Sequence, residues 1–488
     1  MANKLSTNFS GGMNAKTAPL IIKDNECELI VNYNLDTLGA LTKRNGYDVF
    51  ATQPVAAKRV HGLFQYTNTS ASAETTQVMV VNNSGDTQAV IYYNNAGTWA
   101  TSKTNDTAVS TFTNFNRARF STFLDYLFRV NGVDVVGTSI NVNGSTWGTT
   151  NAPATITPSF IEIFQDRVYL ARNGTAAASR VYFSSLPSGG VITWSTTSDF
   201  FDVNPDDGDE ITALENNGNR LLIFKRRGLY RWTFGATEPD RLVGVGTHSE
   251  ECVKTNLDLG ITFFANEYGA YAYTGGRPKL ISRKIQKWFD AIPATDLDDM
   301  CAEVDNDHYY LYLSDSMTVD SVVYTNVMAV YTVSLAAWTI YSLNTPVRVM
   351  SKLVQSSSED IYFGSSNGRT YQWNSGTADD SSGANGDTAT DISSQVVFKD
   401  YLLTFPEKTT VEYVDFISNL AQKTRVEFRM DRKGDFEDLK PEMLTDRFKT
   451  YTVGKECRSI QLRAAESSQT ASVIEGFNIQ HKPKTERK

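Results

Sequence analysis

Cysteine and histidine are both scarce in this sequence, with four of each among 488 residues. The cysteines lie far apart and form no Cys-x-x-Cys pair, which argues against a disulfide framework and favours synthesis in a reducing cytosol. The histidines share no metal-ligand spacing. These residues are Cys27, Cys252, Cys301, Cys457, His61, His248, His308 and His481. We expect no metal site, and the sequence presents no cofactor-binding or catalytic residue set.

Long apolar runs and an excess of basic charge are also missing. Residues 261–265 and 330–341 are among the longest apolar stretches, and both are short or interrupted. A transmembrane helix needs about 20 apolar residues, so no membrane span is expected. The first ten residues lack the apolar core of a secretory signal. With 46 Lys+Arg against 55 Asp+Glu, the net charge of −9 argues against a cationic nucleic-acid binder.

Aromatic residues and glycine are abundant, with 23 Tyr, 26 Phe and 32 Gly. Tyrosine and phenylalanine favour strands, while glycine and asparagine favour the tight turns that join them. The composition therefore predicts an all-β protein.

A unit of two short apolar runs and a turn recurs from residue 60 to residue 375, and it usually closes at a tryptophan. Successive tryptophans lie 48, 47 and 38 residues apart from Trp99 to Trp232, and 35 apart from Trp338 to Trp373. This spacing is close to the period of propeller blades. Runs such as 221–224 are apolar at every position, which indicates strands buried on both faces. We predict a six- to seven-bladed β-propeller over residues 60–375; one long β-sandwich, or two, is the alternative.

Three segments flank this repeat region. Residues 1–59 form an N-terminal arm and platform segment, which packs on the body of the chain or on a neighbouring subunit. Residues 376–394 are rich in Ser, Gly and Asp and are predicted to be a flexible linker or loop. Residues 395–488 alternate apolar and polar positions, which predicts a small antiparallel sandwich or platform domain. This domain has a net charge of +2 (17 minus 15), so the remaining residues carry −11 (29 minus 40).

Four short motifs were weighed for chemistry. Residues 364–368, Gly-Ser-Ser-Asn-Gly, match the nucleophile pattern of hydrolases, but the segment that follows reads as a strand, so a hairpin loop is favoured. Residues 202–210 place oxygen ligands at calcium-type spacing, yet Gly208 is displaced and Ala213 stands where the bidentate Glu belongs. A solvated loop is favoured there, with calcium binding left open, and the acidic turn 305–308 is interpreted in the same way. The basic cluster 225–228 is predicted to be a hairpin tip that could contact phosphate or an acidic partner.

The segments 97–99 and 143–147 resemble sialidase-type propeller turns but lack the aspartate of that motif. Because no pair of carboxylates stands out for glycosidase chemistry, we expect a protein that is not an enzyme.

The two ends of the chain resemble bacteriophage tail proteins, which often open with a Gly-Gly-x-Asn, Ala-Pro, Lys-Arg-Pro-Gly progression. Here Asn45 stands in place of the proline. The matching segments are Phe9–Asn14, Ala18-Pro19, Gly39–Tyr47, Arg180–Ser184, Asp207–Leu214, Leu221–Lys225, Arg458–Arg463 and Val473–Ile479. The chain resembles in particular the tail nozzle (tubular) protein of short-tailed phages.

This resemblance implies a propeller fused to a platform, and a homohexameric ring in the virion tail that is built from subunits made in the host cytoplasm. The implied partners are the adaptor and other portal-proximal tail proteins, tail fibres or spikes, and double-stranded DNA that passes through the lumen without sequence-specific binding. An acidic wall would let the duplex slide. The alternatives are a glycan-binding or glycan-cleaving propeller for host attachment, with aromatic and carboxylate groups at one mouth, and a cellular interaction scaffold.

Overall fold

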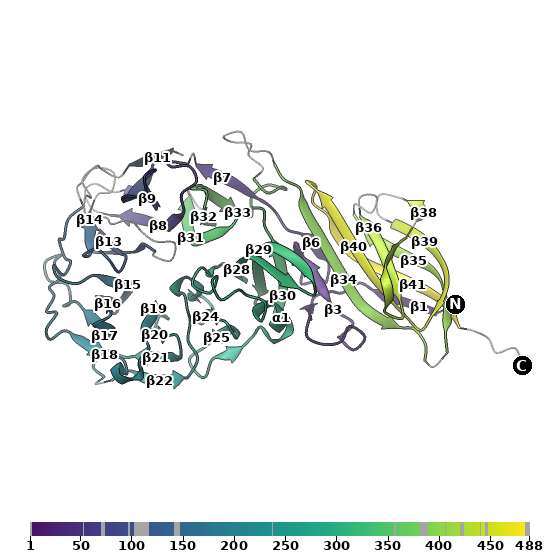
Figure 1. Cartoon of the computed structure of the whole chain (residues 1–488), viewed down its shortest axis with the longest axis horizontal. Coiled ribbons are helices and arrows are strands. Elements are labelled where there is room, and N and C mark those ends of the chain that lie inside the picture. The colour runs from purple at the N-terminus through teal and green to yellow at the C-terminus, as the bar shows by residue number, and fades with distance from the viewer. Residues whose placement is uncertain are drawn as a thin grey trace, which may run out of the picture.

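The computed structural model describes residues 2–51, 53–69, 74–95, 98–101, 117–140, 147–236, 238–355, 358–380, 389–405, 407–419, 424–439, 441–444 and 448–483. Within these residues, seven antiparallel sheets stand around a common centre as a β-propeller, and a sandwich-like platform projects from one side (Figure 1). The first and last described strands, β1 (Ala2–Ser6) and β41 (Val473–Pro483), pair with each other in the platform. No helix among the described residues is long and apolar enough to cross a membrane.

The propeller sheets follow one another along the chain. The first contains β8 (Val60–Asn68), β9 (Glu74–Asn82), β10 (Ala89–Asn95) and β11 (Thr98–Thr101). The second contains β12 (Arg119–Phe123), β13 (Tyr126–Val130) and β14 (Gly137–Ser139). The third contains β15 (Pro158–Phe164), β16 (Arg167–Asn173), β17 (Ala177–Phe183) and β18 (Phe200–Asp202). The fourth contains β19 (Ile211–Asn216), β20 (Leu221–Lys225), β21 (Gly228–Trp232) and β22 (Asp240–Val243).

The fifth sheet contains β23 (Lys254–Asn256), β24 (Ile261–Asn266), β25 (Gly269–Tyr273) and β26 (Lys279–Leu280). The sixth contains β27 (Cys301–Val304), β28 (His308–Val319), β29 (Val322–Thr332) and β30 (Ala337–Ser342). The seventh contains β31 (Val347–Gln355), β32 (Ser358–Ser365), β33 (Thr370–Trp373) and β7 (Tyr47–Ala51). Short helices lie in the connections: η1 (Pro205–Asp207), η2 (Glu250–Cys252), η3 (Arg283–Ile285) and α1 (Gln286–Phe289).

The middle strands are buried on both faces, as their uninterrupted apolar runs predicted. Every residue of β20 is buried. Neighbouring sheets share apolar clusters; for example, Tyr169 of the third sheet and Trp232 of the fourth belong to one core. Face-to-face packing of this kind requires strands that are apolar on both sides.

The ring is closed by a strand from the N-terminal segment. β7 pairs antiparallel with β33, so that Tyr47 lies opposite Trp373 and Asp48 opposite Gln372. Tyr47 is fully buried and packs on Tyr371 and Phe363. Residues 47–51, which the sequence placed in the arm 1–59, therefore belong to the propeller.

The platform is continuous with the sixth propeller sheet. β30 pairs with β4 (Leu29–Val31), and the sheet continues through β34 (Ile392–Leu402), β40 (Ser459–Ser468), β36 (Arg425–Met430) and β37 (Lys433–Asp438). The facing sheet contains β38 (Pro441–Leu444), β39 (Phe448–Cys457), β35 (Thr409–Ser418), β41 (Val473–Pro483), β6 (Leu41–Lys43), β5 (Tyr33–Leu35) and β1 (Ala2–Ser6). β2 (Gly12–Met13) and β3 (Glu26–Cys27) form a small parallel pair. Much of the N-terminal segment is thus part of this chain's own platform.

The predicted linker 376–394 contains fixed residues at both ends. Asp379 is 1% exposed, and β34 already begins at Ile392. The carboxylate of Asp379 accepts two hydrogen bonds from the Arg44 guanidinium, at 2.7 and 2.8 Å. Arg44 Nε also donates to Asn32 Oδ1 at 2.9 Å. This buried group ties the propeller's last segment to the platform, so these two stretches are not flexible; residues 381–388 lie outside the described part.

Candidate functional site

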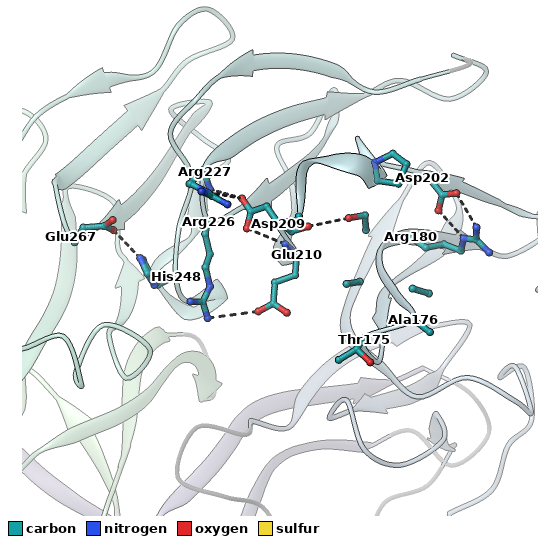
Figure 2. A pocket seen from close by; sticks show the side chains of 15 residues that line it. Thr175, Ala176, Arg180, Asp202, Asp209, Glu210, Arg226, Arg227, His248 and Glu267 are labelled. Atoms are coloured by element: carbon teal, nitrogen blue, oxygen red, sulfur yellow. Dashed lines mark hydrogen bonds and ion pairs between the residues drawn. The ribbon is translucent and has the colours of Figure 1, made fainter.

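A cavity of about 850 Å³ opens on one face of the propeller across its third, fourth and fifth sheets (Figure 2). Turns between second and third strands supply Thr175, Arg226 and Glu267, while connections between sheets supply Asp209 and His248. Strand direction alternates within each sheet, so these two kinds of connection meet on the same face of the ring. The volume is within the range of ligand-binding pockets.

A buried lysine organises the acidic loop 202–210 beside this cavity. The Lys225 ammonium is fully buried and donates to Asp207 Oδ1 at 2.8 Å and to the carbonyl oxygens of Asn204 and Asp209 at 3.0 and 3.2 Å. It also donates to Ser179 Oγ at 3.0 Å. Burial opposes ionisation of Asp207, but the hydrogen bonds from Lys225, the Asp209 backbone and Asn204, together with the Lys225 charge, outweigh it and lower the pKa of that carboxyl. Of the residues at calcium-type spacing, Asn204 thus gives its carbonyl oxygen to Lys225, and Asp202 is paired with Arg180.

Most of the other charged side chains of the cavity form ion pairs with neighbouring side chains. Arg180 forms a two-pronged ion pair with Asp202, at 2.7 and 2.9 Å. His248 Nε2 lies 2.9 Å from Glu267 Oε2, and a hydrogen bond to Asp298 raises the pKa of this histidine. Arg226 lies 3.7 Å from Glu210. The basic cluster 225–228 is a hairpin tip, as predicted, but Lys225 points inward instead of into solvent.

The cavity does not present the lining expected of a sugar site. Its described lining contains carboxylates, arginines and small side chains, and no aromatic residue is among them. Aromatic faces are the usual apolar surface of a binding pocket. The glycan hypothesis requires aromatic and carboxylate side chains together, and this cavity supplies only the carboxylates.

No group of three or more His, Cys, Asp or Glu side chains suited to a metal ion occurs in the described ranges.

The propeller's central channel is narrow and filled with charged side chains. Residues of the innermost strands of all seven sheets line a cavity of about 300 Å³ there. Lys254 Nζ lies 3.7 Å from Glu303 and 3.9 Å from Glu251, and Arg119 forms an ion pair with Glu250. Burial raises the pKa of Glu215 to about 7. A DNA duplex is far larger than this cavity.

The remaining motifs are structural turns. Gly364–Gly368 joins β32 to β33 as a hairpin, so Ser366 is followed by a strand, where a nucleophile elbow requires a helix. Asp305 accepts hydrogen bonds from the backbone of Asp307 and His308 and from Tyr310 Oη. Gly97 and residues 143–146 of the sialidase-like segments lie outside the described residues.

One feature of this face was missed by sequence reasoning. Arg59, Arg117 and Arg348 stand close together around the segment that contains Asp299. They come from three distant parts of the chain, and no local pattern in the sequence links them.

Comparison with known proteins shows no family for this chain. No family model matches the sequence, and no curated protein matches it. Among solved structures, the chain is similar to YCF48 bound to a D1 peptide, with a TM-score of 0.41 and 8% identity over 67% of this chain and 95% of that one. It is also similar to the extracellular domain of the putative hybrid two component system BT3049 from B. thetaiotaomicron, with a TM-score of 0.46 and 11% identity over 93% of this chain and 61% of that one. The AfRom2 CNH domain matches with a TM-score of 0.38 and 9% identity over 67% of this chain and 98% of that one. By its own sheet topology, the chain is an all-β propeller protein with a fused platform.

Proposed function

We propose that this protein is a non-enzymatic building block of a bacteriophage tail, a nozzle subunit that assembles as a homohexamer around the path of the DNA. The proposal rests first on the resemblance of the chain ends to such tail proteins. The observation that carries it further is the nine-stranded sheet that runs from the sixth propeller sheet into the platform. A shared sheet fixes the angle between the two parts, which a subunit of a closed ring requires.

The residues behind the resemblance at the two ends of the chain lie within the platform or at its border with the propeller, whereas Arg180–Ser184, Asp207–Leu214 and Leu221–Lys225 lie in or beside the third and fourth propeller sheets. Phe9 is buried against Phe398 and Phe477, with ring centroids 5.1 and 6.2 Å apart. Arg44 holds Asp379 in the buried group described above. The side chains of Phe9 and Arg44 therefore stabilise the platform and its junction with the propeller. This role fits a structural subunit better than an enzyme.

The proposal places the DNA path between subunits. A cavity of about 300 Å³ inside one propeller excludes a duplex, so any lumen would be formed by a ring of copies. The net charge of −11 on residues 1–394 would weaken duplex binding to such a wall.

Mass measurement and negative-stain microscopy of the purified full-length chain test this role, alone and mixed with the adaptor protein encoded by the same phage. We expect hexameric rings, and antibodies to the chain should label the tail of intact virions. A chain that stays monomeric in both conditions and is absent from virions would refute the proposal.

A further inference from the structure

A second cavity, of about 340 Å³, opens on the same face as the first, where the seventh, first and sixth sheets meet. The segment before β8 supplies Lys58 and Arg59, and the start of β31 supplies Arg348. Asp299 lies in the connection before β27, and Ser366 lies in the β32–β33 turn. Cationic side chains outnumber carboxylates in this lining, three to two, with His61 in addition. In a chain of net charge −9 this is a local excess of positive charge.

The Arg59 guanidinium is the most informative group in this cavity. Its side chain is 8% exposed, and within the described ranges it forms an ion pair with Asp299, whose Oδ1 lies 2.7 Å from Arg59 Nη2. The buried Nε atom of Arg59 has no hydrogen-bond partner among the residues that the structure describes. A buried donor without a partner is costly, because desolvation of a charged group is then not offset by a new bond.

Neighbouring arginines add to the shortage of negative charge. Arg348 lies 3.9 Å from the same Asp299 carboxylate, although its main partner is Asp315. Arg117 lies beneath the same segment and donates to the Asp299 carbonyl oxygen at 3.0 Å. Burial and the positive charges of Arg117 and Arg348 lower the pKa of Arg59. The Asp299 carboxylate is thus shared by the guanidiniums of Arg59 and Arg348, and the Arg117 guanidinium lies beside them.

We propose that this cavity binds a phosphate group. Arginine donors match phosphate oxygens in geometry and charge, and a phosphate would give Arg59 Nε an acceptor. Lys58, Arg348 and Ser366 also line this cavity, where Lys58 forms an ion pair with Asp86. The cavity is larger than inorganic phosphate requires, so it has room for the substituent of a phosphate monoester. The inference goes beyond the tail role and does not depend on it.

Calorimetric titration of the full chain with inorganic phosphate, at constant ionic strength set with sodium chloride, tests the site. We expect saturable binding with a Kd of roughly millimolar or tighter. Glycerol 3-phosphate in place of phosphate distinguishes the source: tighter binding of the ester indicates a phosphorylated headgroup or glycan, and equal binding indicates free phosphate. Absence of saturable binding by both probes would overturn the proposal.

Variants localise the binding. Arg59→Gln should weaken it about tenfold, the effect of losing one hydrogen bond between charged groups. Arg227→Gln serves as the matched control, because Arg227 lies on the same face at the first cavity and its side chain is 75% exposed. Equal weakening by both variants would show diffuse electrostatic attraction and would overturn the site.

A second pair of variants covers the case in which Arg59→Gln does not fold. Ser366 lies in a partly exposed hairpin turn, so Ser366→Asp should leave the fold intact while it places a negative charge beside the phosphate. We expect Ser366→Asp to lose phosphate binding and Ser366→Asn to retain it. Full binding by Ser366→Asp would contradict the location that we assign.

Discussion

Replacement of Asp379 by alanine tests the buried connection between propeller and platform. In the native chain the side chains of Arg44 and Asp379 are 2% and 1% exposed, and two hydrogen bonds of 2.7 and 2.8 Å join them. Alanine at position 379 would leave the Arg44 charge buried without its carboxylate. Arg44 would retain its bonds to Asn32 Oδ1 and to two backbone carbonyl oxygens. These neutral acceptors compensate only part of the lost charge.

Removal of one partner of a buried ion pair lowers the free energy of unfolding by about 3–5 kcal/mol. We expect Asp379→Ala to fall in this range, and Asp379→Asn to fall below it because the amide oxygen still accepts one bond. The double variant Arg44→Met/Asp379→Ala should recover part of the loss, since it leaves no buried charge unpaired.

Urea unfolding followed by tryptophan fluorescence and by circular dichroism measures these differences. The matched control is Lys455→Ala, which removes an exposed ion pair with Glu437 and should change the free energy by about 0–1 kcal/mol. If Asp379→Ala differs from the native chain by no more than this control, the buried pair does not stabilise the fold and the reasoning is refuted.

Three further predictions concern the propeller. Lys225→Met should lower the free energy of unfolding by about 3–5 kcal/mol, because it leaves Asp207 without its buried partner, and millimolar calcium should not shift the thermal unfolding temperature of the native chain. Burial raises the pKa of Glu215 from 4.5 to about 7, so the folded state holds this proton longer; stability should fall as pH rises through that window, and less steeply in Glu215→Gln when melting temperature is measured against pH. Tyr47→Ala should cost about 3–5 kcal/mol by chemical unfolding because it opens a cavity in a ring-closing strand, whereas Tyr268→Ala, at a 65% exposed position, should have almost no effect. The first prediction is contradicted if Lys225→Met is as stable as the native chain. The second is contradicted if Glu215→Gln has the same pH profile as the native chain, and the third if the two tyrosine variants have equal effects.

Local signals in the sequence were reliable where the cause was local. The apolar run 221–224 predicted a strand buried on both faces, and β20 is one. The turn chemistry of 364–368 and the strand after it predicted a hairpin. Alternation in residues 395–488 predicted strands with one buried face, and β35 alternates in this way over much of its length.

Long-range pairing could not be inferred in the same way. The Asn45-Gly46 pair signals a turn, yet Gly46 serves a close approach, because a Cβ there would lie 1.7 Å from the Ala378 carbonyl oxygen. The partner segment lies more than 300 residues away, and its Ser- and Gly-rich composition indicated a linker. Composition reports how often such residues occur in loops, whereas burial of Asp379 depends on an arginine that folding brings to it.

The sequence by itself determined the secondary structure class and the repeat, because strand and turn preferences act over a few residues. Tertiary structure decided the number of sheets in the ring, the closure by β7 and the continuous sheet through β4, because each requires strands that are distant along the chain. It also decided the chemistry of the propeller face. Among the described residues, Lys225 has Asp207 as its partner and Arg59 Nε is without an acceptor only because of the groups that the folded chain places around them.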